Sequence, residues 1–205
     1  MLSEKDKAAE LVKVADGIAQ CQACGLARSR NQTVPGQGSP NATILMIGEA
    51  PGYHEDQQGL PFVGPAGQFL DELVASIGLR REDVYICNII KCRPPQNRDP
   101  LPTEVLACRP WLDRQIEIIQ PKIIVTLGRF SLARYFPGQS ISKIHGRERR
   151  RGDVIYFPMY HPAAALHRGS LRQTIEEDMK KLIPLLDEAK ELKGATPEPR
   201  QLTMF

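Results

Sequence analysis

Four of the five cysteines in this sequence are spaced as metal ligands are. Cys21 and Cys24 form a Cys-x2-Cys pair, and Cys92 and Cys108 follow much later in the chain. A tight turn aims the two thiolates of such a pair at one point, as a chelate requires. From these residues alone three interpretations stay open: a zinc site, an iron–sulfur cluster, or buried thiols that share no metal. Cys87, the fifth, lies in an apolar segment, and we expect a buried thiol.

Further residues that could do chemistry lie within or just after three short apolar segments. The stretch Gly48-Glu49-Ala50-Pro51-Gly52 and then Glu55 follow the first segment, Asn88 lies in the second, and His161 follows the last. The glycine-containing stretch lacks the lysine and the spacing of a P-loop, and it is too short for a dinucleotide fingerprint. The G-x-S-x-G elbow of acyl-transfer enzymes is also missing. These patterns disfavour a nucleotide cofactor and serine-based acyl transfer.

The apolar pattern predicts the elements that must position these residues. We expect four strands, each short, apolar and rich in β-branched residues, at 43–48, 83–91, 122–128 and 153–160. We expect helices with apolar side chains at helical spacing at 4–19, 66–77, 103–120 (bent at Pro110), 129–136 and 171–192. This alternation predicts right-handed βαβ units and a parallel sheet with helices on both faces. Ligands bind beyond the carboxyl ends of such strands, so the candidate residues should converge there.

Composition and charge narrow the class of protein. Hydrophobic residues make up 41% of the sequence and charged residues 25%, as in an ordinary globular protein. No apolar run approaches the roughly 18 residues that span a membrane, and the charged N-terminus lacks the apolar region of a secretion signal. We therefore expect a monomer in the cytoplasm, where cysteines bind metals more often than they form disulfides. A formal net charge of +3 permits a nucleic-acid partner without requiring one.

Taken together, several motifs resemble one family. They are GEAPG, GLPFVGPAGQFLD, NIIKCRPPQNR, ACRPWL, KIHG and YHPAAAL, in this order and with the four cysteines at this spacing. They look like a family-4 uracil-DNA glycosylase, the iron–sulfur branch of the uracil-DNA glycosylase superfamily, over about residues 15–190. The resemblance implies an α/β fold, a three-layer αβα sandwich around a four-stranded parallel sheet. It also implies a [4Fe-4S] cluster on the four cysteines, and hydrolysis of the N-glycosidic bond of deoxyuridine in DNA.

The resemblance also implies roles for the residues of the base pocket. Phe62 would stack on a flipped uracil, and the Asn88 amide would pair with its O4 and N3–H. An amide offers one acceptor and one donor, which match uracil and mismatch cytosine. The backbone after Gly48 would bind O2, and His161 would donate a hydrogen bond to O2 as charge builds on the departing base.

One position departs from the best-known members of the superfamily. Those members carry an aspartate that positions water, and the matching residue in this chain is Ala50. Family-4 members also lack this aspartate. The group that activates water is therefore open between Glu49 and Glu55. We favour Glu49 for stabilising water or the glycosyl cation, and Glu55 for shaping the substrate pocket against the methyl group of thymine.

DNA contacts are expected from the loops around the same edge. Leu166 is a candidate wedge that holds the duplex open, beside Arg168. Arg93 in the proline-rich loop could contact the backbone. The arginine-rich run at residues 147–151 is either a solvated turn or a further phosphate contact.

Two further expectations concern the reaction and the end of the chain. A related cluster-bearing branch traps DNA through a histidine in the loop after the second strand; CRPPQNRDP has none, so we expect turnover rather than covalent trapping. No lysine is placed in the motifs for a Schiff base, so we expect an abasic site without strand cleavage. The alternatives are a non-catalytic or covalently trapping uracil-DNA-binding protein, or a glycosylase of broader substrate range. Residues 1–192 are expected to form one domain, and 193–205 a flexible tail. Its residues Gln201–Phe205 resemble the peptide that binds the bacterial sliding clamp.

Overall fold

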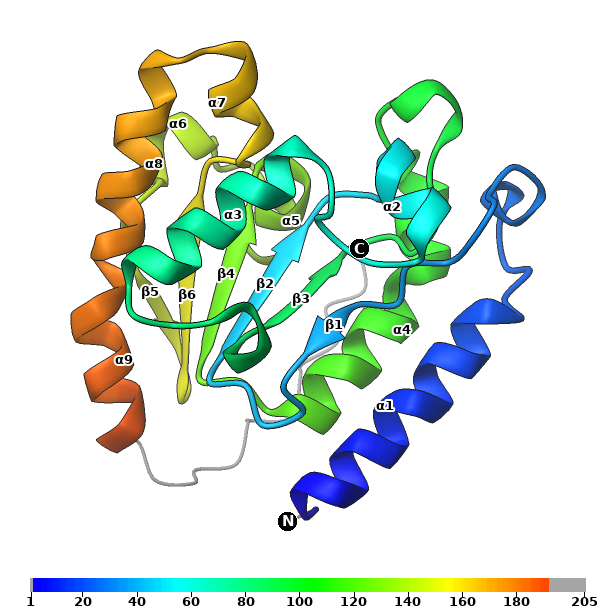
Figure 1. The fold of residues 1–205 in the computed structure, drawn as a ribbon, viewed down its shortest axis with the longest axis horizontal. Helices are drawn as coiled ribbons and strands as arrows, with labels where there is room; N and C mark the ends of the chain where they lie inside the picture. The colour runs from blue at the N-terminus through cyan, green and yellow to red at the C-terminus, as the bar shows by residue number, and fades with distance from the viewer. Residues whose placement is uncertain (1, 192–205) are drawn as a thin grey trace.

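A six-stranded sheet forms the centre of the fold (Figure 1). In the computed structural model, which describes residues 2–191, the strand order is β1-β3-β2-β4-β6-β5. The four inner strands run parallel to one another: β2 (Ile44–Gly48), β3 (Tyr85–Asn88), β4 (Ile123–Leu127) and β6 (Val154–Met159). Every residue of β2, β3 and β4 is buried, as expected for strands covered on both faces. The four predicted strands are thus confirmed.

Two short antiparallel strands extend the sheet at its edges, so the predicted number of four strands is wrong. β1 (Gln37–Gly38) pairs with β3, and β5 (Arg149–Arg151) pairs with β6. Segments this short carry no apolar alternation, so only their pairing with a neighbouring strand defines them. The predicted α/β class is confirmed.

Helices cover both faces of the sheet and make three layers. On one face, α3 (Pro65–Ser76), α8 (Ser170–Lys180) and α9 (Leu182–Glu191) share a core with alternate residues of the inner strands. On the opposite face, α4 (Pro102–Ile119) and α5 (Arg129–Tyr135) cover the other side chains of the strands. α1 (Glu4–Ala19) packs outside α4 through a small apolar cluster (Figure 1).

The predicted last helix is divided in two. α8 ends at Lys180 and α9 begins at Leu182, although we expected one helix over 171–192. Pro184 explains the break, because it lacks an N–H group and its ring clashes with the carbonyl four residues earlier, at Lys180. Pro110, by contrast, lies inside the single helix α4.

Several short elements lie in segments expected to be loops. They are α2 (Tyr53–Gln58), α6 (Ile141–Ile144), α7 (Ala163–His167) and the 3-10 turns η1 (Gly25–Arg28), η2 (Arg81–Asp83) and η3 (Pro95–Asn97). Each is too short to show a full helical repeat in sequence. Among residues 2–191, no helix has the length and apolar character needed to cross a membrane. The predicted tail, residues 193–205, lies outside the described residues.

Candidate functional site: convergent side chains at the carboxyl edge of the sheet

The carboxyl ends of the inner strands bring the predicted pocket residues together. Gly48 and Asn88 are paired neighbours at the ends of β2 and β3, and His161 follows β6 closely. The strand register therefore places three residues that are far apart in sequence at the same edge of the sheet.

Gly48 lies where no side chain could fit. A Cβ atom at this position would lie 2.4 Å from Oδ1 of Asn88 and 2.6 Å from Cζ of Phe62. The amide of Asn88 and the ring of Phe62 thus approach the backbone of Gly48 from two directions. This close approach explains why the first motif begins with glycine.

Phe62 and His161 form a stacked pair of rings in the pocket. Their centroids are 5.4 Å apart and their planes differ by 23°. Phe62 is buried, and His161 contacts the backbone of Gly128, where a Cβ atom would lie 3.1 Å from Cβ of His161. The structure therefore assembles all four predicted base-contacting residues, Gly48, Phe62, Asn88 and His161.

The side chain of Asn88 presents an unused hydrogen-bond acceptor. The residue is 2% exposed, and its Oδ1 accepts no hydrogen bond from any residue that the structure describes. A buried polar atom without a partner is costly, and such atoms are often reserved for a ligand. Its backbone carbonyl, by contrast, accepts a hydrogen bond from Nζ of the buried Lys91 at 2.8 Å.

His161 is held in one neutral form. The backbone N–H of Ala163 donates to Nδ1 at 3.1 Å, so this nitrogen acts as an acceptor and the ring proton lies on Nε2. Although part of the residue is accessible, its ring is withdrawn from water, which lowers the pKa to about 4; the charge of Glu55 partly offsets this effect. At neutral pH His161 is therefore a neutral donor through Nε2.

The two candidate carboxylates have different surroundings. Glu49 is half-buried beside an ion pair in which Nη2 of Arg129 lies 2.5 Å from Oδ2 of Asp99. Burial raises the pKa of Glu49, the charge of Asp99 adds to this effect, and Arg129 opposes it. Ala50 contributes a methyl group that packs against the core on the α4 face.

Glu55 is engaged by the loop around the pocket. Its Oε1 accepts hydrogen bonds from the backbone N–H groups of Val63 and Gly64, at 2.9 and 3.0 Å, and its Oε2 accepts one from Gly52 at 3.1 Å. The carboxylate therefore ties the start of α2 to the loop that carries Phe62. It thereby fixes the backbone on this side of the site.

The predicted DNA contacts lie on α7, just after it, and in the segment after β3. Leu166 on α7 is 51% exposed, and Arg168 follows it in an exposed segment. The guanidinium of Arg93 lies over the ring of Tyr53, 5.2 Å from its centroid. Tyr53 itself is exposed.

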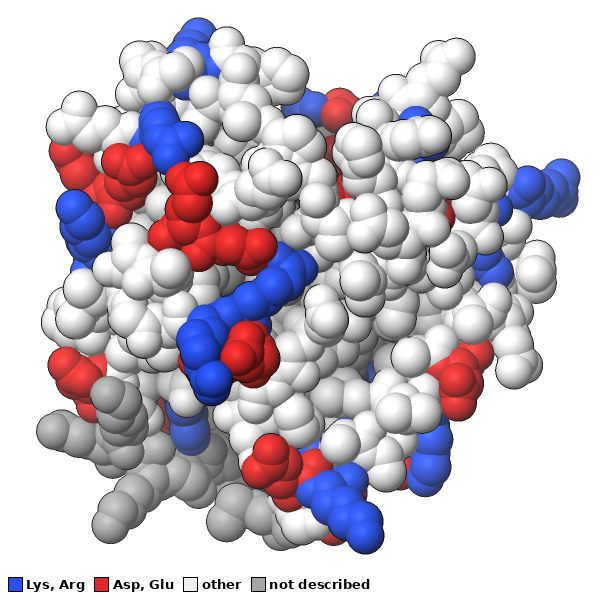
Figure 2. Space-filling view, in the orientation of Figure 1, with Lys and Arg blue, Asp and Glu red and all other residues white. Residues whose placement is uncertain are grey.

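The arginine-rich run is largely occupied by contacts within the chain. Arg150 pairs with Glu188, and Arg151 lies over the ring of Phe136, 4.8 Å from its centroid. On the face drawn in Figure 2, basic and acidic side chains lie next to one another over α3, and no single sign of charge dominates there. These contacts favour a structural role for the run.

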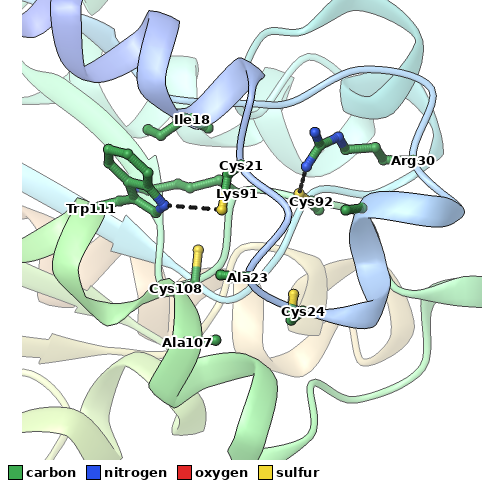
Figure 3. A pocket seen from close by; sticks show the side chains of 11 residues that line it. Ile18, Cys21, Ala23, Cys24, Arg30, Lys91, Cys92, Ala107, Cys108 and Trp111 are labelled. Atoms are coloured by element: carbon green, nitrogen blue, oxygen red, sulfur yellow. Dashed lines mark hydrogen bonds between the residues drawn. The ribbon is translucent and has the colours of Figure 1, made fainter.

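All four predicted ligand cysteines line one pocket (Figure 3). Cys21 and Cys24 follow α1, Cys92 follows β3, and Cys108 lies on α4. In Figure 3 their sulfur atoms face a common space from three sides. The structure thus brings together residues that are up to 87 positions apart, counted as 108 minus 21. Cys87 lies apart from them, fully buried on β3, as predicted.

Nitrogen donors approach two of these sulfur atoms. Nε1 of Trp111 lies 3.4 Å from Sγ of Cys21, and Nη1 of Arg30 lies 3.2 Å from Sγ of Cys92 (Figure 3). Such donors stabilise thiolates and metal-bound sulfur. Burial raises the pKa of the thiol of Cys92, and it raises that of Cys108 to about 11. Metal binding at these sites would therefore have to displace protons.

The four thiols surround a space but do not converge on one point. Within residues 2–191, no three His, Cys, Asp or Glu side chains are grouped closely enough to hold a single metal ion. An iron–sulfur cluster carries its ligands on separate iron atoms, so it needs cysteines spread around a cavity. Four cysteines that line one cavity are a donor set that fits such a cluster.

Comparison with known proteins agrees with this fold and site. Residues 35–185 match the family described as the uracil DNA glycosylase superfamily. A type-4 uracil-DNA glycosylase from Sulfurisphaera tokodaii is 48% identical over 182 residues, which cover 84% of this chain and 83% of the relative. Another from Archaeoglobus fulgidus is 48% identical over 174 residues, 80% of this chain and 87% of the relative. A third, from Thermotoga maritima, is 44% identical over 173 residues, which cover 82% of this chain and 90% of the relative.

The class that the fold and the pocket define is therefore that of a superfamily of base-excising enzymes. Within it, the chain belongs to the type-4 uracil-DNA glycosylase family, as its motifs predicted.

Proposed function

We propose that this protein removes uracil from DNA by hydrolysing the N-glycosidic bond of deoxyuridine, leaving an abasic site and an intact strand. One observation carries the proposal: a buried amide acceptor on Asn88, without a partner among the described residues, lies beside the ring of Phe62 at the end of a parallel sheet. A base inside a duplex is out of reach, so the deoxyuridine must be flipped into this pocket.

Asn88 and Phe62 read and hold the base. Oδ1 of Asn88 accepts the N3–H of uracil, and its Nδ2 donates to O4. Cytosine presents an acceptor at N3 and an amino group at C4, so both contacts fail with it. Phe62 supplies the apolar face on which the base stacks.

His161 stabilises the departing base. Since Nδ1 accepts from Ala163, the neutral ring donates through Nε2 to O2, where negative charge builds as the glycosidic bond breaks. A neutral donor at this position keeps its proton, and the uracil leaves as an anion stabilised by hydrogen bonds. Backbone groups that follow Gly48, including that of Ala50, bind the same O2 atom of uracil.

Glu49 acts on the sugar side of the bond. A glycosyl cation needs little nucleophilic push, so a carboxylate that orients water or stabilises positive charge is sufficient. Glu55 keeps its place in the pocket wall and narrows the space around the C5 position of the base.

Two surfaces receive the DNA around the flipped nucleotide. Leu166 enters the gap left by the base, and Arg168 and Arg93 contact phosphates on either side.

The four cysteines would hold a [4Fe-4S] cluster. When bound, the cluster supplies a cross-link between the segment after α1, the loop after β3, and α4. Trp111 and Arg30 orient and stabilise the sulfur ligands through their N–H groups. We assign the cysteines a structural task, because the residues proposed for chemistry include none of them.

An excision assay tests the function. The purified full-length protein is incubated with duplex and single-stranded oligonucleotides that contain one uracil, and abasic sites are then cleaved with hot alkali. We expect an alkali-labile product and release of free uracil. A lack of product from both substrates would refute the enzyme, and a complex that survives denaturation would indicate covalent trapping.

Replacing Asn88 tests the recognition step. Asn88→Ala should lower kcat/KM about a hundredfold, because two hydrogen bonds of about 1.4 kcal/mol each are lost. Binding of uncleaved DNA should change less than about threefold. Asn41→Ala is the matched control, since Asn41 is an exposed loop asparagine away from the pocket. Equal losses of excision and DNA binding would contradict the assigned role of Asn88.

A further inference from the structure

Phe62, which forms one wall of the base pocket, has a backbone conformation that bulky residues rarely adopt. Its φ angle is 52°, in the left-handed region, where glycine occupies most of the positions found in the described chain. A residue with a Cβ atom is strained there, so neighbouring groups must hold it in place. The contacts that maintain this conformation therefore also fix the wall of the pocket.

Arg81 supplies such contacts from a distant segment. Its Nη1 donates to the carbonyl of Phe62 at 3.2 Å, and its Nη2 donates to the carbonyl of Pro61. The same Nη1 lies 2.6 Å from Oδ1 of Asp71 on α3. A guanidinium group carries five N–H donors in a rigid planar fork, so it can hold two carbonyls and a carboxylate together.

Helix α3 closes the other side of the same peptide group. A Cβ atom at Gly67 would lie 1.9 Å from the carbonyl oxygen of Phe62, so the first turn of α3 touches this group directly. Asp71, one turn later, accepts from Arg81. The loop is also held through its next two residues, whose N–H groups donate to Glu55. Its carbonyls and its N–H groups are thus bound by separate side chains.

Arg81 lies behind the wall, outside the base pocket. Its side chain is 25% exposed, and it lines a separate surface cleft together with Gln37, Ser39 and Glu82. It can therefore influence a bound base only through the loop that it holds.

We propose that Arg81 is a positioning residue for uracil recognition: it binds the carbonyls of Pro61 and Phe62 and so sets the plane on which the base stacks. This inference rests on the proposed function. It deepens it, because it names a residue that controls the geometry of the pocket without contacting the substrate.

The neighbouring arginine provides a matched control. Arg80 is 71% exposed and pairs with Glu82 and Asp83 within its own segment. Arg80→Lys and Arg81→Lys both preserve charge and remove a planar fork, but only the second removes contacts to the Phe62 loop.

The experiment compares these variants in the full-length protein as purified. Arg81→Lys should lower kcat/KM for a uracil-containing oligonucleotide roughly ten- to a hundredfold, since a small displacement of a positioning group costs this much. The inhibition constant of free uracil should rise in parallel, while the visible spectrum stays unchanged. Arg80→Lys should keep both constants within about twofold of the unmodified protein.

A double-mutant cycle separates positioning from general destabilisation. In a Phe62→Ala background the stacking wall is gone, so Arg81→Lys should cost at most about twofold more. Fully additive losses, or equal effects of Arg80→Lys and Arg81→Lys, would overturn the proposal. In both of these outcomes the unmodified protein is active, so only this inference fails. If the unmodified protein is inactive, the proposed function fails and this inference fails with it.

Discussion

At the scale of single residues, the pocket depends on backbone groups that set the chemistry of its side chains. Ala163 determines which nitrogen of His161 carries the proton, and three backbone N–H groups determine where Glu55 lies. The side chain types suit uracil recognition, and these backbone contacts give each of them one orientation. In His161, the hydrogen bond that Nδ1 accepts therefore makes Nε2 the nitrogen that can donate.

The lowered pKa of His161 leads to a prediction for pH dependence. We expect the loss of single-turnover excision that is caused by His161 to occur only towards pH 4, because the neutral ring persists until its pKa of about 4. Protonation of Glu49, whose pKa is raised by burial, should add a separate loss that His161→Gln retains. Rates measured from pH 8 to 4, with His161→Gln for comparison, would test this. The variant should be slow and should lack the fall caused by His161. A midpoint near pH 6.5 that disappears in His161→Gln would show an ordinary histidine and contradict the assignment.

The same shift affects folding stability in a defined direction. An unfolded chain protonates this histidine below about pH 6.5, whereas the folded chain resists protonation until about pH 4. His161 therefore lowers stability as the pH falls through this window, and it has no such effect above it. Excision rates at low pH should be measured below the unfolding temperature at each pH.

At the scale of elements, the ends of the sheet strands are tied to the helices behind them. Nζ of the buried Lys91 donates to the carbonyl of Asn88 at 2.8 Å and to Oε1 of Gln115, on α4, at 2.7 Å. Nε2 of Gln115 continues the network to the carbonyl of Pro35. Lys91 also lines the cysteine pocket. The segment that is proposed to read the base is thus joined to the helix that carries Cys108.

The proposed cluster predicts a specific response to loss of one ligand. Purified protein should show the broad visible absorption of an iron–sulfur cluster, and Cys108→Ala should lose it. A cross-link over this span stabilises a fold by about 2–5 kcal/mol, so Tm should fall by roughly 4–20 °C. Cys87→Ala is the control, because this buried thiol lies apart from the cysteine pocket and should leave the absorption intact. A colourless protein with stoichiometric zinc would refute the cluster.

At the scale of the whole molecule, one edge of the sheet carries the proposed chemistry and the DNA contacts. β2, β3 and β6 deliver the pocket residues to this edge, while α7 and the segment after β3 flank it. The cysteine pocket lies beside the same region, behind the proline-rich loop. A cluster on these cysteines would therefore cross-link segments next to the proposed DNA contacts without entering the proposed reaction.

The tail leads to a prediction that is independent of the fold. Gln201–Phe205 lie outside the described residues, and we propose that they dock in the apolar groove of a bacterial sliding clamp. Deleting residues 201–205 should abolish clamp binding, measured by biolayer interferometry. Excision from short oligonucleotides should be unchanged, because the proposed pocket lies within the described chain. Clamp binding that survives the deletion would rule out this peptide.

Local pattern predicted most of the framework. The first helix was predicted over residues 4–19 and is found as Glu4–Ala19, and all four inner strands lie within their expected ranges. Periodicity in a continuous segment reports which face is buried, so it defines such elements without tertiary information. The edge strands and the short helices were not predicted in this way, because their formation depends on contacts with neighbouring segments.

The sequence by itself determined the cysteine set, the residue types of the pocket and, through the motifs, the family. Only the tertiary structure decided how these residues are held: that Ala163 leaves the ring proton of His161 on Nε2, that Glu55 binds the backbone of the Phe62 loop, and that Arg81 binds the carbonyl of Phe62. The physical reason is that hydrogen-bond partners and burial depend on which segments meet in space. The spacing of residues along the chain does not show which segments come into contact.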